Sequence, residues 1–194
     1  MLAPRLLTAH VSQTRGGRAK LPFTPFHFGP GLALKGVAAP VFSWSAFAVA
    51  QVLIDCETLY YLVHQEYPVH RFLHSFLGAT AAGLVAAILC LAIVRTSALD
   101  IARRIAPLVV STSTARAELS SLGVLLGGLA GGLSHPFLDG IMHPDVRPFM
   151  PWSDNNPFLG LIGVVQLHLA CIAAALFGAV CVTLWRIHNA QRAG

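Results

Sequence analysis

Four long stretches of the chain are mostly apolar and carry no Lys, Arg, Asp or Glu. They cover residues 36–54, 72–94, 119–138 and 155–185, and each lies between charged residues. About 20 apolar residues in a helix cross the hydrocarbon core of a bilayer. The pattern therefore predicts an all-α integral membrane bundle of about four transmembrane helices. The fourth helix is expected to begin after Pro157, and the first is the least regular because Gly36 and Pro40 interrupt it.

The composition agrees with a lipid surrounding. Of the 194 residues, 55% are hydrophobic and 11% are charged, whereas soluble domains average about 25% charged residues. The net charge is +5, but the basic residues lie between the apolar stretches rather than along one face, so we expect no nucleic-acid partner. The four cysteines include no C-x-x-C spacing, and no disulfide framework is predicted.

The N-terminal residues 1–21 are basic and have only a short apolar patch. This patch is too short and too poorly placed for a secretion signal. We expect residues 1–21 to be a disordered leader or an over-extended start. Residues 22–194 are expected to form a single transmembrane helical domain.

The third apolar stretch is rich in glycine at four-residue spacing. Gly123, Gly127 and Gly131 form one such row, and Gly128 and Gly132 form another. Small residues at this spacing let neighbouring helices approach closely in a membrane. The rows predict tight packing around this helix.

The basic residues predict the orientation of the bundle. If four helices cross, only Arg71 and Arg147 of the 13 lysine and arginine residues lie on one side of the membrane. Cytoplasmic loops carry the excess of Lys and Arg. The loops 55–71 and 139–154 are therefore expected on the non-cytoplasmic side, and they carry six of the eight carboxylates and three of the nine histidines.

Histidines and carboxylates gather at the predicted helix ends. His70 and His74 are four residues apart in H-R-F-L-H-S, so both should project from one face if the second helix starts there. His135 and Asp139 repeat this spacing at the end of the third helix. The neighbouring polar loops add Asp55, Glu57, His143 and Asp145.

An ionisable group at membrane depth is costly and usually has a partner. A divalent cation would satisfy neutral imidazoles and ionised carboxylates together, and zinc, manganese or iron suits such mixed ligands. The alternatives are a hydrogen-bonded helix terminus for His135 and Asp139, and solvated loop positions for Glu57, His143 and Asp145.

The motifs H-R-F-L-H-S and S-H-P-F-L-D resemble those of the membrane-bound metal-dependent hydrolases, the LexA-regulated inner-membrane family. The resemblance runs over residues 24–152, and it places an early histidine at His27 in T-P-F-H-F-G-P-G and an acidic stretch at Asp55 and Glu57. It implies a metal site that includes His27, a hydrolase activity and a location in the bacterial inner membrane. The sequence D-C-E departs from the two aspartates more usual in that family.

For His27 to reach this site, residues 28–39 must form a short re-entrant arm that turns at Pro40. Backbone of this kind is tolerated at membrane depth only when it is buried against protein or lines a watery cavity. If residues 1–21 are discounted, the arm leaves seven basic residues on one side and two on the other, and the site still faces away from the cytoplasm. If residues 1–21 are counted, the two sides of the membrane carry seven and six basic residues, and the charges predict no orientation.

The sequence thus favours a membrane-embedded metal-dependent hydrolase that uses a metal-activated water. His70, His74, His135, Asp139 and Asp55 would hold one or two ions, with Glu57, His143 or Asp145 as the general base. A phosphoester or a lipid-derived substrate fits the location, while no residue fixes the oligomeric state. The alternative is a non-catalytic metal-binding or transport protein, which a polar path along Gln166 and His168 would favour.

Overall fold

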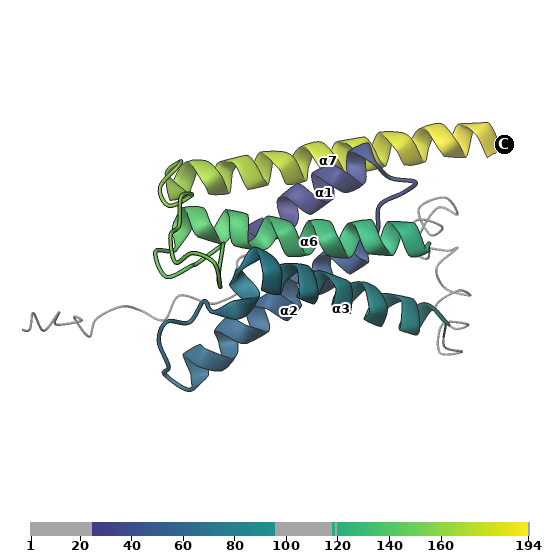
Figure 1. Ribbon diagram of the computed structural model, residues 1–194. Helices are drawn as coiled ribbons and strands as arrows, with labels where there is room; N and C mark the ends of the chain where they lie inside the picture. Colours follow the sequence, from purple (N-terminus) through teal and green to yellow (C-terminus); the bar gives the residue numbers. More distant parts are fainter. Residues whose placement is uncertain (1–24, 96–117, 119, 194) are drawn as a thin grey trace, which may run out of the picture.

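The computed structural model describes residues 25–95, 118 and 120–193, and within them it is all-helical. The predicted leader, residues 1–21, lies outside the described residues. The elements follow the order η1 (Pro25–His27), α1 (Phe28–Val37), α2 (Trp44–Val63), η2 (Phe72–His74), α3 (Phe76–Arg95), α6 (Ser121–Met142) and α7 (Val164–Ala193). Among these, α2, α3, α6 and α7 are long and apolar enough to cross a membrane. The prediction of a four-helix membrane bundle is confirmed (Figure 1).

The first predicted span, 36–54, is wrong, because the chain turns where a continuous helix was expected. α1 ends at Val37 and α2 begins only at Trp44. Pro40 lacks an amide hydrogen and disfavours helical backbone at the preceding residue. α1 and α2 therefore form a bent hairpin, with the re-entrant arm that the position of His27 requires (Figure 1).

Lys35 and Glu118 fasten the turn of this hairpin. The Lys35 ammonium donates to the carbonyls of Ala39 and Phe42, at 3.2 and 2.6 Å, and lies 2.9 Å from Glu118 Oε1. Glu118 also accepts hydrogen bonds from the Ser43 hydroxyl and from the first amides of α2. An anion at a helix N-terminus is stabilising. Burial raises the pKa of Glu118, but its bonds from Lys35 and Ser43 outweigh burial and lower it.

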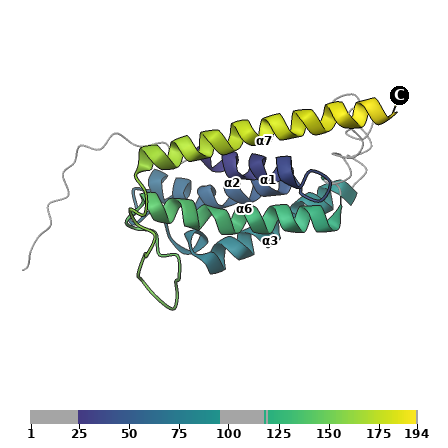
Figure 2. The same cartoon turned by 90° about the horizontal axis from the view of Figure 1, so that it is seen from above.

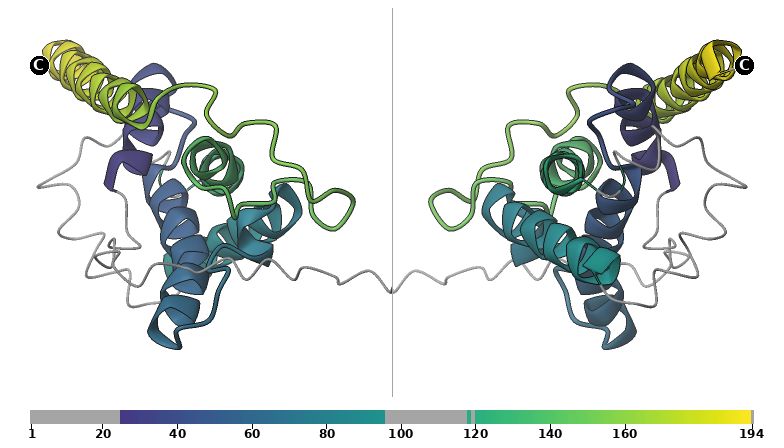
Figure 3. Two further views of the ribbon diagram at one scale, coloured as in Figure 1. Left: turned by 90° about the vertical axis from the view of Figure 1, so that its left-hand side faces the viewer. Right: turned by 90° about the vertical axis from the view of Figure 1, so that its right-hand side faces the viewer.

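The glycine rows of α6 pack as predicted, one on each neighbour. A side chain at Gly127 would collide with the backbone of Ser43, the N-cap of α2, and one at Gly131 with the backbone of α2 itself. A side chain at Gly128 or Gly132 would collide with the backbone of α3. Figure 3, viewed along the bundle, shows α6 between α2 and α3 on one side and the pair α1 and α7 on the other. α6 is thus the central helix, and the residues at its end have protein on several sides.

α7 packs against α1 through a second set of close contacts. A side chain at Gly29 would collide with the backbone of Cys171, and one at Gly178 with that of Leu32. Figure 2 shows α7 running along α1 at the edge of the bundle. Most side chains of α7 are exposed, and most of the exposed ones are apolar, as expected of a helix that faces lipid. The helix begins at Val164, later than the predicted start after Pro157, because residues 157–162 form turns and a bend that include Gly160 at φ +71°.

Candidate metal centre

The predicted site residues meet at one end of the bundle, where the loops 64–75 and 143–163 lie (Figure 1). Asp55, His74, His135 and Asp139 each offer one ligand atom, and these four atoms lie within 4.8 Å of one another. All four residues are buried. Three segments that are distant in the sequence, α2, η2 and α6, therefore converge on one polar cluster inside an apolar bundle.

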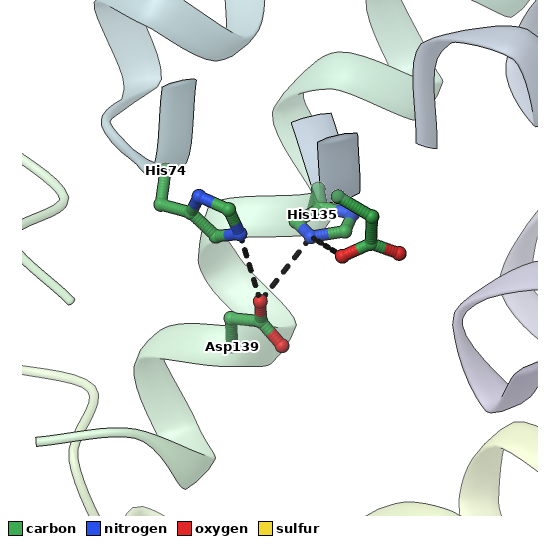
Figure 4. A group of neighbouring side chains, drawn as sticks. His74, His135 and Asp139 are labelled. Carbon is green, nitrogen blue, oxygen red and sulfur yellow. Dashed lines mark ion pairs between the residues drawn. The ribbon is translucent and has the colours of Figure 1, made fainter. Parts of the chain in front are cut away.

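Asp139 is the centre of this cluster. Its Oδ2 lies 3.4 Å from Nε2 of His74 and 3.2 Å from Nε2 of His135. Figure 4 shows both imidazoles pointing at this one oxygen. Nε2 of His135 also lies 3.3 Å from Oδ1 of Asp55. Because His135 and Asp139 are four residues apart on α6, they share the helix face that points toward α2 and η2.

The other ring nitrogen of His135 is held by an amide. Gln51 donates its Nε2 to the carbonyl of Gly131 at 3.1 Å and to Oγ of Ser134 at 3.0 Å, which fixes the orientation of the amide. Oε1 of Gln51 therefore accepts from Nδ1 of His135. With its proton on Nδ1, the neutral imidazole keeps a lone pair on Nε2.

His74 is held in the same way by a carboxylate. Nδ1 of His74 lies 3.2 Å from Oε2 of Glu57, while the Thr58 hydroxyl lies 3.2 Å from Nε2. Glu57 also accepts from the backbone amides of Arg71 and Leu73, so it holds the turn η2 in place. Burial lowers the pKa of His74, but hydrogen bonds to Asp139 and Glu57 outweigh burial and raise it. A cation at Nε2 would thus compete with a proton.

His70 and His74 do not share a helix face, contrary to the prediction. His74 ends the short turn η2, and α3 begins only at Phe76, because the Ser75 hydroxyl accepts from the amide of Gly78 and caps the helix. The two rings still meet edge to face, with centroids 4.7 Å apart. His70 therefore comes from the loop before η2 and His74 from the last residue of η2, and neither comes from α3.

Asp145 contacts His70 with both carboxylate oxygens. Each lies 2.9 Å from Nδ1 of His70. Burial raises the pKa of Asp145, but the hydrogen bond from His70 outweighs burial and lowers it to about 2. Asp145 is therefore an anion that orients an imidazole. The general-base roles predicted for Glu57 and Asp145 stay predictions, and in the structure both carboxylates hold histidines.

His143 follows the end of α6 and its ring lies tilted beside that of His70, with centroids 4.4 Å apart and an interplanar angle of 32°. Its Nε2 lies 3.9 Å from Oδ1 of Asp139, and about a third of its side chain is exposed. Burial lowers the pKa of His143, and Asp139 opposes this only in part. His143 is thus a neutral imidazole at the outer edge of the cluster.

The arm brings His27 to the cluster. Its Nε2 lies 3.3 Å from Oδ1 of Asp139, and its ring meets that of His135 edge to face at 4.8 Å. The ring is buried, and among the described residues neither of its nitrogens has a hydrogen-bond partner. An orphaned imidazole in such a place is explained by a ligand or a cation.

Two site residues were not predicted from the sequence, Gln51 and Thr58. Together with Asp55 they form a polar stripe at positions i, i+4 and i+7 of α2, and all three are buried. A lone amide four residues before a carboxylate in an apolar stretch was the signal that could have indicated them. His64 and Glu66, by contrast, are exposed.

His168 and Gln166 do not extend the cluster into a polar path among the described residues. The His168 ring stacks on Phe26 with centroids 4.3 Å apart, and its Nε2 has no hydrogen-bond partner there. Gln166 is exposed at the start of α7.

Comparison with known proteins identifies a membrane family. No curated protein and no solved structure matches the chain significantly. The sequence model of the YdjM inner membrane protein family matches residues 22–193, nearly the whole chain. This match and the four apolar helices support an integral inner membrane protein, the coarser part of the resemblance read from the motifs. The chain belongs to the YdjM inner membrane protein family.

Proposed function

We propose that this protein is a membrane-embedded metal-dependent hydrolase, with a divalent cation bound by Asp55, His74, His135 and Asp139. One observation carries the proposal: His74 and His135 each have Nδ1 engaged by an oxygen of the protein and Nε2 turned toward the same carboxylate. In metal sites, a histidine that binds the ion through one ring nitrogen almost always donates a hydrogen bond from the other ring nitrogen to an oxygen.

The separations of the donor atoms fit a cation. Ligands at about 2.1 Å from a tetrahedral ion are about 3.4 Å from one another. The three contacts of Nε2 atoms with Asp55 and Asp139 measure 3.2, 3.3 and 3.4 Å. Two imidazoles and two carboxylates suit zinc, manganese or iron. His27, whose Nε2 lies 3.3 Å from Oδ1 of the same Asp139, is a further donor.

Asp55, His74, His135 and Asp139 would hold the cation, which when bound would supply a water molecule of lowered pKa for attack on an ester. In hydrolysis the water oxygen forms a bond to the acyl or phosphoryl centre, the ester bond breaks, and the leaving oxygen receives a proton. The chain orients the donors for this reaction through Gln51 and Glu57. The carboxylates of Asp55 and Asp139 balance the two positive charges that would otherwise be costly at this depth.

The depth of the site favours an amphiphilic substrate. Asp139 lies three residues and His135 seven residues before the end of α6, or about 5 and 10 Å below it. The exposed rings of Tyr60, Tyr67 and Trp152 lie at the same end, as aromatic residues do at a membrane interface. A lipid-derived ester or phosphoester would present its polar head at this level.

The proposal is tested on the full chain in lipid nanodiscs. Metal content by mass spectrometry, and hydrolysis of bis(4-nitrophenyl) phosphate, 4-nitrophenyl butyrate and vesicles of phosphatidylethanolamine and phosphatidylglycerol, are compared with those of His135→Ala and Asp139→Asn. His64→Ala, which removes an exposed histidine, is the matched control. We expect bound metal and turnover in the wild type and the control, and neither in the site variants.

Two results would contradict this proposal in different ways. Full metal content in both site variants would refute the site itself. Metal bound by the wild type and lost in both variants, with none of these esters hydrolysed, would favour the non-catalytic metal-binding protein instead.

A further inference from the structure

A second set of donors lies directly beside the first and shares one residue with it. His70, His143 and Asp139 offer ligand atoms within 4.8 Å of one another. The two oxygens of Asp139 face different histidines: Oδ2 lies near His74 and His135. Oδ1 lies 3.9 Å from Nε2 of His143 and 3.3 Å from Nε2 of His27. A carboxylate that presents its oxygens to two groups of imidazoles has the arrangement of a bridging ligand.

The orientation of His70 repeats that of the two inner histidines. Its Nδ1 is engaged by Asp145 at 2.9 Å, which leaves Nε2 as the nitrogen that can bind a cation. A carboxylate behind a histidine fixes the ring and raises its basicity as a ligand. His70, His74 and His135 thus all have Nδ1 held by Asp145, Glu57 or Gln51.

The charge of the cluster also calls for two cations. Four carboxylates meet the histidines, namely Asp55, Glu57, Asp139 and Asp145. Among the described residues, no lysine or arginine side chain forms an ion pair with any of them. With neutral imidazoles, a single divalent cation leaves two negative charges, whereas two divalent cations balance all four. Unbalanced charge is expensive where water is scarce.

The two positions differ in their access to solvent. The side chains of His74 and His135 are fully buried, whereas that of His143 is 32% exposed. A closed site keeps its ion, and a site with open coordination positions can exchange it and receive substrate. The outer position is therefore the one that meets water.

We propose that His70, His143 and Asp139 bind a second divalent cation, bridged by Asp139 to the buried one, and that this outer ion is the exchangeable one on the substrate side. This inference rests on the proposed metal-dependent function and makes His143 a ligand instead of a general base. Two-ion sites of this kind clamp both the attacking and the leaving oxygen in phosphoester hydrolysis.

The test counts the ions without recourse to activity. Full-length protein in nanodiscs is loaded with Mn²⁺, and metal per chain is measured together with the electron paramagnetic resonance spectrum. We expect two ions per chain and an exchange-coupled spectrum in the wild type. His143→Ala and His143→Gln should each bind one ion with an uncoupled six-line spectrum. His64→Ala, the matched control, should keep two.

Three outcomes would overturn the inference and are distinguishable. One ion in the wild type would remove the outer position and leave the buried site intact. No ion in the wild type would remove the proposed function as well. Two coupled ions in both His143 variants would show that His143 is not a ligand. Thermal melting of each variant in the metal-free state verifies that the fold is retained.

Discussion

Gln51 offers the sharpest test of how the chain prepares the metal centre. Its side chain is buried, accepts from His135 Nδ1 and is itself held by Gly131 and Ser134. Replacing it with leucine, Gln51→Leu, keeps a similar volume and removes the acceptor. Gly131 and Ser134 keep a partner, because the Ser134 hydroxyl also donates to the Gly131 carbonyl at 3.2 Å. Only Nδ1 of His135 loses its acceptor. The rest of the packing is unchanged, and we expect the fold to survive.

The expected loss is in metal affinity. Without Gln51, the ring of His135 is free to turn, and its proton is no longer fixed on Nδ1. Loss of such a partner typically weakens metal binding by about 10- to 100-fold, or about 1.4 to 2.8 kcal/mol at 1.4 kcal/mol per factor of ten. The donors Asp55, His74 and Asp139 remain in place, so binding should weaken and not vanish.

The assay is competition with a zinc-chelating dye in nanodiscs, together with thermal melting of the metal-free protein. Ser134→Ala is the matched control: it removes one of the two bonds that orient Gln51, but the bond to the Gly131 carbonyl at 3.1 Å remains. Its effect on affinity should be clearly smaller than that of Gln51→Leu. Wild-type zinc affinity in a stably folded Gln51→Leu variant would refute the reasoning.

Three further predictions concern the fold and its placement. The hydrogen bonds from Lys35 lower the pKa of the Glu118 carboxyl below 4.5. The Lys35–Glu118 pair therefore stabilises the protein above pH 4.5, and this stabilisation is lost as the pH falls through the lowered pKa. Melting curves should show a smaller acid-induced drop in melting temperature for Glu118→Gln than for the wild type. Gly128→Val should lower the melting temperature through its collision with α3, whereas Ala81→Leu on the exposed face should not. The orientation is tested by labelling single cysteines, in a variant without the native cysteines, with a membrane-impermeant maleimide in intact spheroplasts. If the end of the bundle that carries the site is non-cytoplasmic, the reagent should label Asp154→Cys and should not label a cysteine appended to the C-terminus.

The sequence predicted the membrane helices well where length and hydropathy decide the structure. The spans that became α3 and α6 were placed within a few residues of their ends. The glycine rows also predicted the two close-packed faces of α6, because small residues at four-residue spacing have a direct steric consequence. The first span failed because a count of apolar residues does not distinguish one crossing from an arm, a turn and a crossing.

The candidate metal centre was also predicted only in part from the sequence. The pair His135 and Asp139 was predicted correctly as one helix face, because both residues lie within α6. The shared face predicted for His70 and His74 depended on a helix that starts at His70, and the helix starts later. Spacing alone does not distinguish a loop before a helix capped by Ser75 from a first helical turn. The spacing of Gln51 and Asp55 could have indicated a polar position on α2, but it could not assign Gln51 to His135, because 84 residues separate the two positions.

The motifs alone could not show whether His27 reaches the site, because this depends on how α1 packs. In a straight first span it would lie on the opposite face of the membrane from Asp55. α1 has ten residues, about 15 Å of helix. Its far end is tied to the turn of the hairpin by Lys35 and its flank to α7 by Gly29. Because both contacts hold the same short helix α1, its N-terminal end places His27 beside Asp139. The contacts of Lys35 at one end of α1 therefore help to position the imidazole of His27 at the other end.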